Sequence, residues 1–253
     1  ADISLSGLGG DGTNSDYGVE ISSSAIVRTA DGNIDVTATS GMAGGSSDER
    51  ALNLNSSGTI DSIGSGMITV TATGRTEDFH INGGILGDTF GVGAITIHAD
   101  SASLTGANVI RSAGDLTFTP RTASTTIGIG SGVGTLNLDG AELATLQPGF
   151  NSITIGDTAA GTGTVDIGSS TFNDDVTIAG GSILMTGLLD ATTNKATLIA
   201  RNGSITADNV GTDISSNTLR LEAAGSITDA NNPTTGSLDI DTTVVTAFTT
   251  AGD

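Results

Sequence analysis

The feature that most constrains the fold of this chain is a short unit, glycine–any residue–aliphatic residue, that recurs along the whole length. In most copies the aliphatic residue begins a run in which apolar and polar residues alternate. Alternation over four to six residues, bounded by Gly, Asn, Asp and Ser, is typical of half-buried β-strands. The glycine before each strand permits a positive φ, so that the chain can turn a corner without a Cβ clash. The unit begins at Gly32, Gly58, Gly66, Gly93, Gly114, Gly134, Gly163, Gly181, Gly203, Gly225 and Gly236.

The alternating pairs predict many short strands at intervals of roughly ten to twenty residues, which suits a coil of roughly 20 residues with longer intervals absorbed by corner loops. Pairs that follow the glycine unit are Ile34/Val36, Ile68/Val70, Ile95/Ile97, Leu116/Phe118, Leu136/Leu138, Val165/Ile167 and Leu238/Ile240. Pairs without it are Val19/Ile21, Leu52/Leu54, Phe79/Ile81, Ile153/Ile155, Val176/Ile178 and Leu219/Leu221.

We therefore predict an all-β fold, a right-handed parallel β-helix (β-solenoid). Residues 1–119 are expected to form a segment with longer corner loops, and residues 120–253 a segment with shorter, more regular coils. Tandem β-sandwich domains are the alternative, because Asp-Gly and Asn-Gly pairs such as Asp31-Gly32 and Asn82-Gly83 also mark hairpins. The only predicted helical turn is Gly140–Gln147, which Pro148-Gly149 would end.

Composition supports a stacked architecture and excludes several functions. Aromatic residues make up only 3% of the chain, so the core has to be built from stacked small aliphatic side chains. The hydrophobic share of 36% argues against disorder. The formal net charge of −20 disfavours nucleic-acid binding. The lack of cysteine excludes disulfides, thiolate zinc sites and thiol catalysis. No apolar run approaches the ~18 residues of a membrane helix.

Several stretches resemble the repeats of filamentous-haemagglutinin-like bacterial surface exoproteins, the giant adhesins exported by two-partner secretion. They are DYGVEISSSAIVRTADGNIDVTATSG (16–41), RALNLNSSGTIDSIGSGMITVTATG (50–74), DFHINGGILGDTFGVGAITIHAD (78–100), the segment 135–187, and the NGSITAD and AGSITDA copies at 202–208 and 224–230. The resemblance implies a β-helical stalk, located outside the cell on a bacterial surface. The family's secretion domain carries Asn-Pro-based motifs at its N-terminus. Here Asn232-Pro233 is the only Asn-Pro and does not lie in that setting. The resemblance therefore implies that this chain is part of the stalk and not of the secretion domain.

The resemblance therefore implies a structural stalk or filament segment of an adhesin-like protein, which mediates surface display, adhesion or cell–cell contact. Expected partners are neighbouring segments of the same long chain, axially associated copies, or surface glycans and proteins of other cells. Neither terminus reads as a polar cap, and exposed solenoid ends invite pairing, so we expect truncation from a longer chain or axial self-assembly. A polysaccharide-acting β-helix enzyme and an ice- or calcium-binding β-solenoid are the alternatives.

Catalytic chemistry finds little support, and we predict no enzyme, no catalytic residue and no cofactor-binding residue. Asp174-Asp175 is the only adjacent Asp pair, and neighbours on a strand point to opposite faces. His80 and His98 alternate with apolar residues and are expected to face solvent, with no acid legible beside either to orient it. Gly64-Ser65-Gly66 reads as a turn and not as a nucleophile elbow.

Metal and ice binding rest on short patterns. Residues 9–14 and 83–88 partly echo the calcium-binding β-roll repeat, yet no tandem copy follows. We therefore predict no metal-ligating residue and no cofactor, with structural Ca²⁺ among corner aspartates left open. Irregular coil spacing is expected to break any lattice of the Thr-x-Thr pairs, in which outward threonine is simply a good strand residue. These pairs are Thr37/Thr39, Thr69/Thr71, Thr71/Thr73 and Thr117/Thr119.

Overall fold

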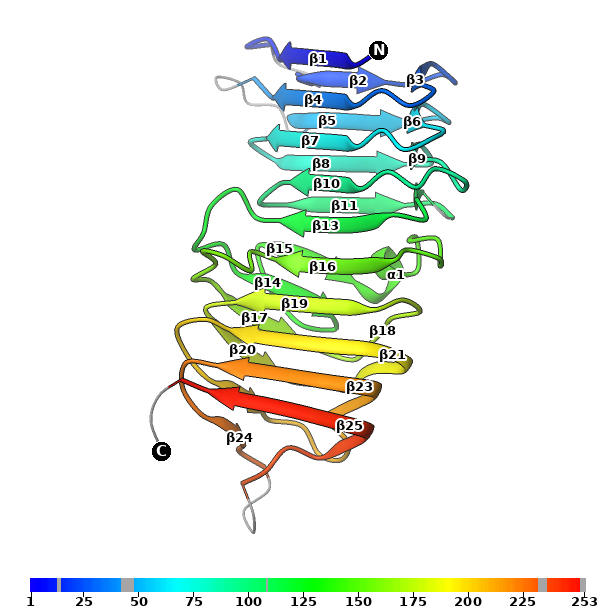
Figure 1. Cartoon of the computed structure of the whole chain (residues 1–253). Coiled ribbons are helices and arrows are strands. Elements are labelled where there is room, and N and C mark those ends of the chain that lie inside the picture. The colour runs from blue at the N-terminus through cyan, green and yellow to red at the C-terminus, as the bar shows by residue number, and fades with distance from the viewer. Residues whose placement is uncertain (13–14, 42–47, 108, 232–235, 251–253) are drawn as a thin grey trace. The chain divides into compact units, whose positions relative to one another are not determined.

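The computed structural model describes residues 1–12, 15–41, 48–107, 109–231 and 236–250. The chain forms two compact units. Unit 1 comprises residues 1–119 with 144–151, and unit 2 comprises residues 120–143 with 152–253. Both are built almost entirely from parallel strands (Figure 1). The predicted parallel β-solenoid is therefore confirmed. Asn232-Pro233 lies outside the described residues.

Unit 1 contains three parallel sheets that the chain visits in turn. Sheet I holds β1 (Ile3–Leu8), β4 (Ile34–Thr39), β7 (Ile68–Thr73), β10 (Ile95–His98) and β13 (Asp115–Thr119). Sheet II holds β2 (Val19–Ile21), β5 (Arg50–Asn55), β8 (Glu77–Asn82) and β11 (Ala102–Thr105). Sheet III holds β3 (Ile26–Thr29), β6 (Thr59–Ser62), β9 (Ile85–Gly87) and β12 (Ile110–Arg111).

Each turn of unit 1 places a strand beside its counterpart from the previous turn. In sheet I, Ile34 pairs with Ile68, and Ile68 pairs in turn with Ile95. These side chains are at most 2% exposed, so the alternating residues stack into a continuous core. β-Sandwiches are built from antiparallel hairpins, whereas the paired strands here run parallel. The tandem β-sandwich alternative is therefore wrong.

The length of a turn varies within unit 1, although the register of the strands does not. Contacting side chains on neighbouring turns are separated by 33 residues at Arg28 and Asp61 and by 27 residues at Arg50 and Glu77. Loops of different length between strands absorb the difference. The strands keep their pairing because a one-residue slip would turn every buried side chain toward solvent.

The recurring glycines serve close packing, and nearly all of them do without the positive φ that glycine permits. Of the predicted corner glycines in the described residues, only Gly236 has a positive φ. Gly32, Gly66 and Gly93 stack on one another in successive turns, and a Cβ on Gly66 would overlap the carbonyl oxygen of Gly32. Glycine is required at these positions because only a hydrogen atom fits between the coils.

Positive φ values occur instead at the corner between sheets II and III. Ser24 has a φ of 63° and Ser57 one of 66°, and in the next turn Gly83 has a φ of 70°. Backbone hydrogen bonds run from Ser24 N to Ser56 O and from Ser57 N to Gly83 O. Serine in this conformation is strained, and the stacked corners hold it in place.

Unit 2 contains two parallel sheets and one short helix. Sheet IV holds β16 (Ser152–Gly156), β19 (Val176–Gly180), β21 (Leu189–Ala200), β23 (Ile214–Ala223) and β25 (Ile240–Thr249), with β18 (Ser170–Thr171) paired to β21. Sheet V holds β15 (Leu136–Asp139), β14 (Ile127–Gly130), β17 (Thr164–Ile167), β20 (Ser182–Met185), β22 (Ile205–Ala207) and β24 (Ile227–Asp229). Helix α1 (Gly140–Leu143) is shorter than the predicted helical turn.

The core of unit 2 is also a stack of aliphatic side chains. Ile178, Leu198 and Leu221 are paired in successive turns of sheet IV and are at most 1% exposed. The predicted pair Leu238/Ile240 is an exception, because β25 begins only at Ile240 and both residues are partly exposed. In the described part of the chain, no helix has the length and hydrophobicity of a membrane span.

Candidate functional site

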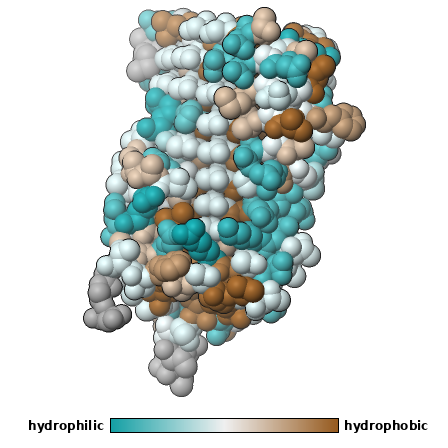
Figure 2. Space-filling view, viewed as in Figure 1, coloured by the Kyte–Doolittle hydropathy of each residue, from teal (hydrophilic) through white to brown (hydrophobic). Residues whose placement is uncertain are grey.

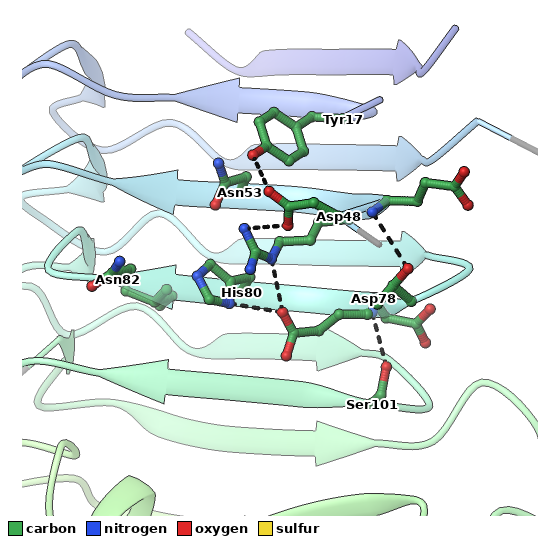
Figure 3. A network of polar contacts seen from close by, with 12 residues as sticks. Tyr17, Asp48, Asn53, Asp78, His80, Asn82 and Ser101 are labelled. Atoms are coloured by element: carbon green, nitrogen blue, oxygen red, sulfur yellow. Dashed lines mark hydrogen bonds and ion pairs between the residues drawn. The ribbon is translucent and has the colours of Figure 1, made fainter. Parts of the chain in front are cut away.

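A chain of ionisable side chains lies on the outer side of sheet II in unit 1. We call Tyr17, Asp48, Arg50, Glu77 and His80 the sheet II network (Figure 3). Arg50 and Glu77 are register partners at the start of β5 and β8, so consecutive turns bring opposite charges together. Tyr17 and Asp48 lie just before β2 and β5 and extend the network to a third turn.

The members of the sheet II network touch one another in sequence. The Tyr17 hydroxyl donates to Asp48 Oδ2 at 2.8 Å, and Arg50 Nη1 lies 2.7 Å from Asp48 Oδ1. Arg50 Nε donates to Glu77 Oε2 at 3.0 Å. His80 Nδ1 lies 2.7 Å from the same Glu77 oxygen, as an ion-pair contact that lacks hydrogen-bond geometry. Glu77 is thus shared between a guanidinium and an imidazole.

The surroundings shift two pKa values in the network. Burial raises the pKa of Glu77, but the contacts with His80 and Arg50 together outweigh it, so the pKa is lowered overall. The pKa of Tyr17 is raised, first by burial and further by the hydrogen bond to Asp48 and its negative charge. Both shifts favour the observed contacts at neutral pH, with Glu77 charged and Tyr17 protonated.

Amide side chains continue the polar surface along sheet II. Asn53 Nδ2 and Asn55 Nδ2 both donate to Glu20 Oε1 at 3.1 Å, across one turn of the coil. Asn53 is 1% exposed, and its Oδ1 has no hydrogen-bond partner among the described residues.

Other arginines of unit 1 join neighbouring turns in the same way. Arg28 Nε and Nη2 donate to the two oxygens of Asp61 at 2.8 and 2.7 Å, and the Asp61 side chain is 3% exposed. Arg75 Nη1 donates to the nearly buried Glu49 at 3.1 Å. We call these contacts, together with Arg50–Glu77, the inter-turn ion pairs.

The expectation that both histidines face solvent is wrong for His80. His80 is only 8% exposed, because Asn53 and Ser103 flank it in the neighbouring turns and Glu77 contacts its ring. His98 is partly exposed on the outer side of sheet I, paired with Thr71 and Thr119. The signal that sequence reasoning missed is Glu77, three residues before His80.

Two other aspartates considered in the sequence analysis accept hydrogen bonds from backbone N–H groups. Asp175 Oδ1 accepts from the backbone N–H of Lys195 at 2.9 Å, which links two turns of unit 2. Asp88, from the second β-roll-like pattern, accepts from the Phe90 N–H within its own turn. The first pattern falls partly on residues 13–14, outside the described residues. Among the described residues, no group of three or more His, Cys, Asp or Glu side chains is arranged to hold a metal ion.

The threonines of sheet I are aligned, contrary to the expectation that irregular coils would break their spacing. Thr37 pairs with Thr71, and Thr39 with Thr73, on the outer side of β4 and β7. Thr69, Thr96 and Thr117 form a second column, although Asp35 and His98 interrupt the pattern. Figure 2 shows pale, near-neutral surface along this face between hydrophilic side chains. The register holds because the extra residues of each turn lie outside sheet I.

The ion pairs and hydrogen bonds join each turn to the next, and the Thr columns place hydroxyl groups on the outer side of sheet I. Comparison with protein-family models, with curated proteins and with solved structures found no match to this chain. The resemblance to filamentous-haemagglutinin-like exoproteins therefore stays a prediction.

Proposed function

We propose that this chain is a stalk or filament segment of an adhesin-like protein displayed on a bacterial cell surface. The observation that carries the proposal is the constant register of sheet I through turns of different length. A repeat that tolerates loop variation while stacking its strands is suited to spanning distance, because each turn needs only its neighbours.

The inter-turn ion pairs support a mechanical role. Among the 8 Lys and Arg residues of a chain with net charge −20, Arg28, Arg50 and Arg75 each bridge two turns. Contacts between turns resist separation of the coils along the axis. A stalk has to be long and rigid, and arginines that join neighbouring turns stiffen the stack of coils.

The exposed last strand of unit 2 supports an axial partner. β25 pairs with β23, and Val245 is 50% exposed although its register partner Leu219 is fully buried. An apolar residue on the core side of an outer strand is covered when another turn stacks upon it. We propose that a further coil, from a longer form of the same chain or from a second copy, occupies this position.

Electron microscopy combined with analytical ultracentrifugation tests the proposal. Rods whose length grows in proportion to the number of residues, in variants with one turn deleted or duplicated, support a stalk. Concentration-dependent end-to-end association that is lost in Val245→Asp supports axial stacking. Compact particles whose dimensions do not follow residue number would contradict the stalk.

The Thr columns of sheet I favour a second candidate function, the binding of ice. Strands about 4.8 Å apart, with outward residues about 6.6 Å apart along each strand, present hydroxyls on a two-dimensional grid. Such a grid can order water at an ice surface. Inhibition of ice recrystallisation by the protein, lost in Thr71→Leu but kept in the exposed loop variant Thr89→Leu, would support this function, and no inhibition would exclude it.

A further inference from the structure

Unit 2 carries a groove on the outer side of sheet IV. Its volume is about 360 Å³, and three successive strands, β21, β23 and β25, form it with the corner that follows each strand. Ile199, Ala200, Ala223 and Ala224 supply apolar lining. Figure 2 shows hydrophilic and apolar surface side by side over these strands. The groove therefore combines apolar lining with charged walls.

Register brings the charged and aromatic walls together from different turns. Glu222 pairs with Phe248 in neighbouring strands, and Arg220 lies two residues before Glu222 on β23. The Arg220 guanidinium carbon lies 5.8 Å from the centre of the Phe248 ring, and Arg220 also forms an ion pair with Glu222. Arg220 is thus held in place and largely neutralised, while the Phe248 side chain stays 52% exposed.

Arg201 is a charged residue of the groove that is available to a ligand. It lies at the corner after β21, is exposed, and lines the same groove. In the described part of the chain its side chain forms no ion pair or hydrogen bond, in contrast to Arg28, Arg50 and Arg75 of unit 1. A free guanidinium beside apolar lining is unusual in a chain of net charge −20.

The side chains that line the groove indicate which class of ligand it can bind. A guanidinium offers a planar fork of donors that matches the two oxygens of a carboxylate. The alanines and the half-exposed Phe248 ring can cover a flat apolar body. The volume lies at the lower end of the ~300–1,000 Å³ typical of small-molecule sites.

We propose that this groove binds a small carboxylate with an aromatic body, with Arg201 pairing with the carboxylate and Phe248 packing against the ring. The inference is independent of the stalk function. Phe248 points to the outer side of β25, as its register partner Glu222 does on β23, so a further coil stacked on the edge of β25 leaves the groove open.

Titration of the ¹⁵N-labelled protein with phenylacetate tests the proposal, with the arginine Nε–Hε signals as the readout. We expect saturable shifts of the Arg201 and Arg220 signals, while that of Arg28 stays unchanged. Phenylacetamide has the same shape without the charge and should bind at least about tenfold more weakly, because it cannot form the charged pair. Equal binding of the acid and the amide, or no shift at Arg201, would overturn the proposal.

Matched variants separate the groove from general electrostatics. Arg201→Gln should weaken phenylacetate binding at least about tenfold, whereas Arg121→Gln, which removes an exposed charge of unit 2 outside the groove, should change it less than about twofold. Phe248→Ala should weaken binding, and Phe248→Leu should retain most of it. Circular dichroism melting curves verify that each variant is folded. Equal effects of Arg201→Gln and Arg121→Gln would refute the assignment.

Discussion

The two units stack parallel strands in the same way but join their turns with different chemistry. In unit 1 the outer contacts between turns include ion pairs, such as Arg50–Glu77 and Arg28–Asp61, beside bonds from backbone N–H groups to side-chain oxygens. In unit 2 they are hydroxyl contacts and carboxylate–backbone bonds: Ser226 N donates to Ser204 Oγ at 3.0 Å, and Asp239 N to Asp213 Oδ2 at 2.8 Å.

The contacts compared here close turns of different length. Paired positions are 33 residues apart at Arg28 and Asp61 in unit 1, but 20 apart at Lys195 and Asp175 in unit 2. Longer loops cost more conformational entropy to order, and charged pairs with buried partners offset part of that cost. Short turns are ordered by the backbone ladder itself, so small hydroxyl side chains suffice between them.

The largest effect is expected in the core of unit 1, where Phe79 and Phe118 meet edge to face with ring centres 6.4 Å apart. Phe79→Ala removes a fully buried ring and should lower the free energy of unfolding of unit 1 by about 3–5 kcal/mol. Unit 2 should keep its stability. Hydrogen exchange measured by mass spectrometry reports on each unit separately. Phe90→Ala, at an 85% exposed position, is the control and should have almost no effect.

The stacked glycines should come next. Gly66→Ala places a Cβ against the carbonyl of Gly32, and the coils must separate locally at a cost of about 1–3 kcal/mol. Gly140 has open space around its Cα, so Gly140→Ala should be neutral or slightly stabilising. Chemical denaturation of both variants measures the contrast. Equal costs would show that the glycines are needed for backbone flexibility and not for close packing.

Breaking one contact of each kind sharpens the comparison between the units. Arg75→Met leaves the nearly buried Glu49 carboxylate without its cation and should cost about 1–3 kcal/mol. Ser204→Ala removes a hydroxyl contact in unit 2 and should cost less than about 1 kcal/mol. Salt should reduce only the first effect, because it screens charges. Equal costs, with equal salt dependence, would remove the distinction drawn between the units.

The smallest effect is a response to acid that has opposite sign in the two units. The lowered pKa of Glu77 stabilises unit 1 above the ordinary glutamate value of about 4.3, and this stability is lost as the pH falls through the folded-state pKa. Burial, with the nearby charges of Asp229 and Asp239, raises the pKa of Asp213, so the charged form destabilises unit 2 and protonation relieves it.

Hydrogen exchange between pH 6 and pH 3, corrected for the intrinsic pH dependence of exchange, should therefore show sheet II loosening around Glu77 while the turn at Asp213 tightens. Glu77→Gln should abolish the first change and Asp213→Asn the second. A change of the same sign at both positions would contradict the assigned contacts.

The strands were predictable from the sequence because alternation of apolar residues directly reports a half-buried strand, as at Ile34/Val36 and Ile68/Val70. The role of the glycines was not, because the overlap of a Gly66 Cβ with Gly32 depends on which turns are stacked. The sheet II network was hidden for the same reason. Arg50 and Glu77 are 27 residues apart, and with turns of varying length no fixed period reveals the pair.

The groove in unit 2 was still harder to foresee. Arg201 and Phe248 belong to different turns, and the residues around Phe248 follow no pattern that marks a site. Only the register between β23 and β25 places an aromatic ring beside Arg220. Pairing of turns, and not the local pattern, creates the surfaces of this fold.

The central claim, that consecutive turns stack in register, is tested most directly by pyrene excimer fluorescence. The chain has no cysteine, so Thr37→Cys with Thr71→Cys provides two unique labelling positions on neighbouring strands. Neighbouring parallel strands are about 4.8 Å apart, and we expect a strong excimer band. Thr37→Cys with Thr119→Cys, on strands that are not neighbours, should give only monomer emission. Monomer emission from the first pair, or equal excimer from both, would contradict the stacked solenoid.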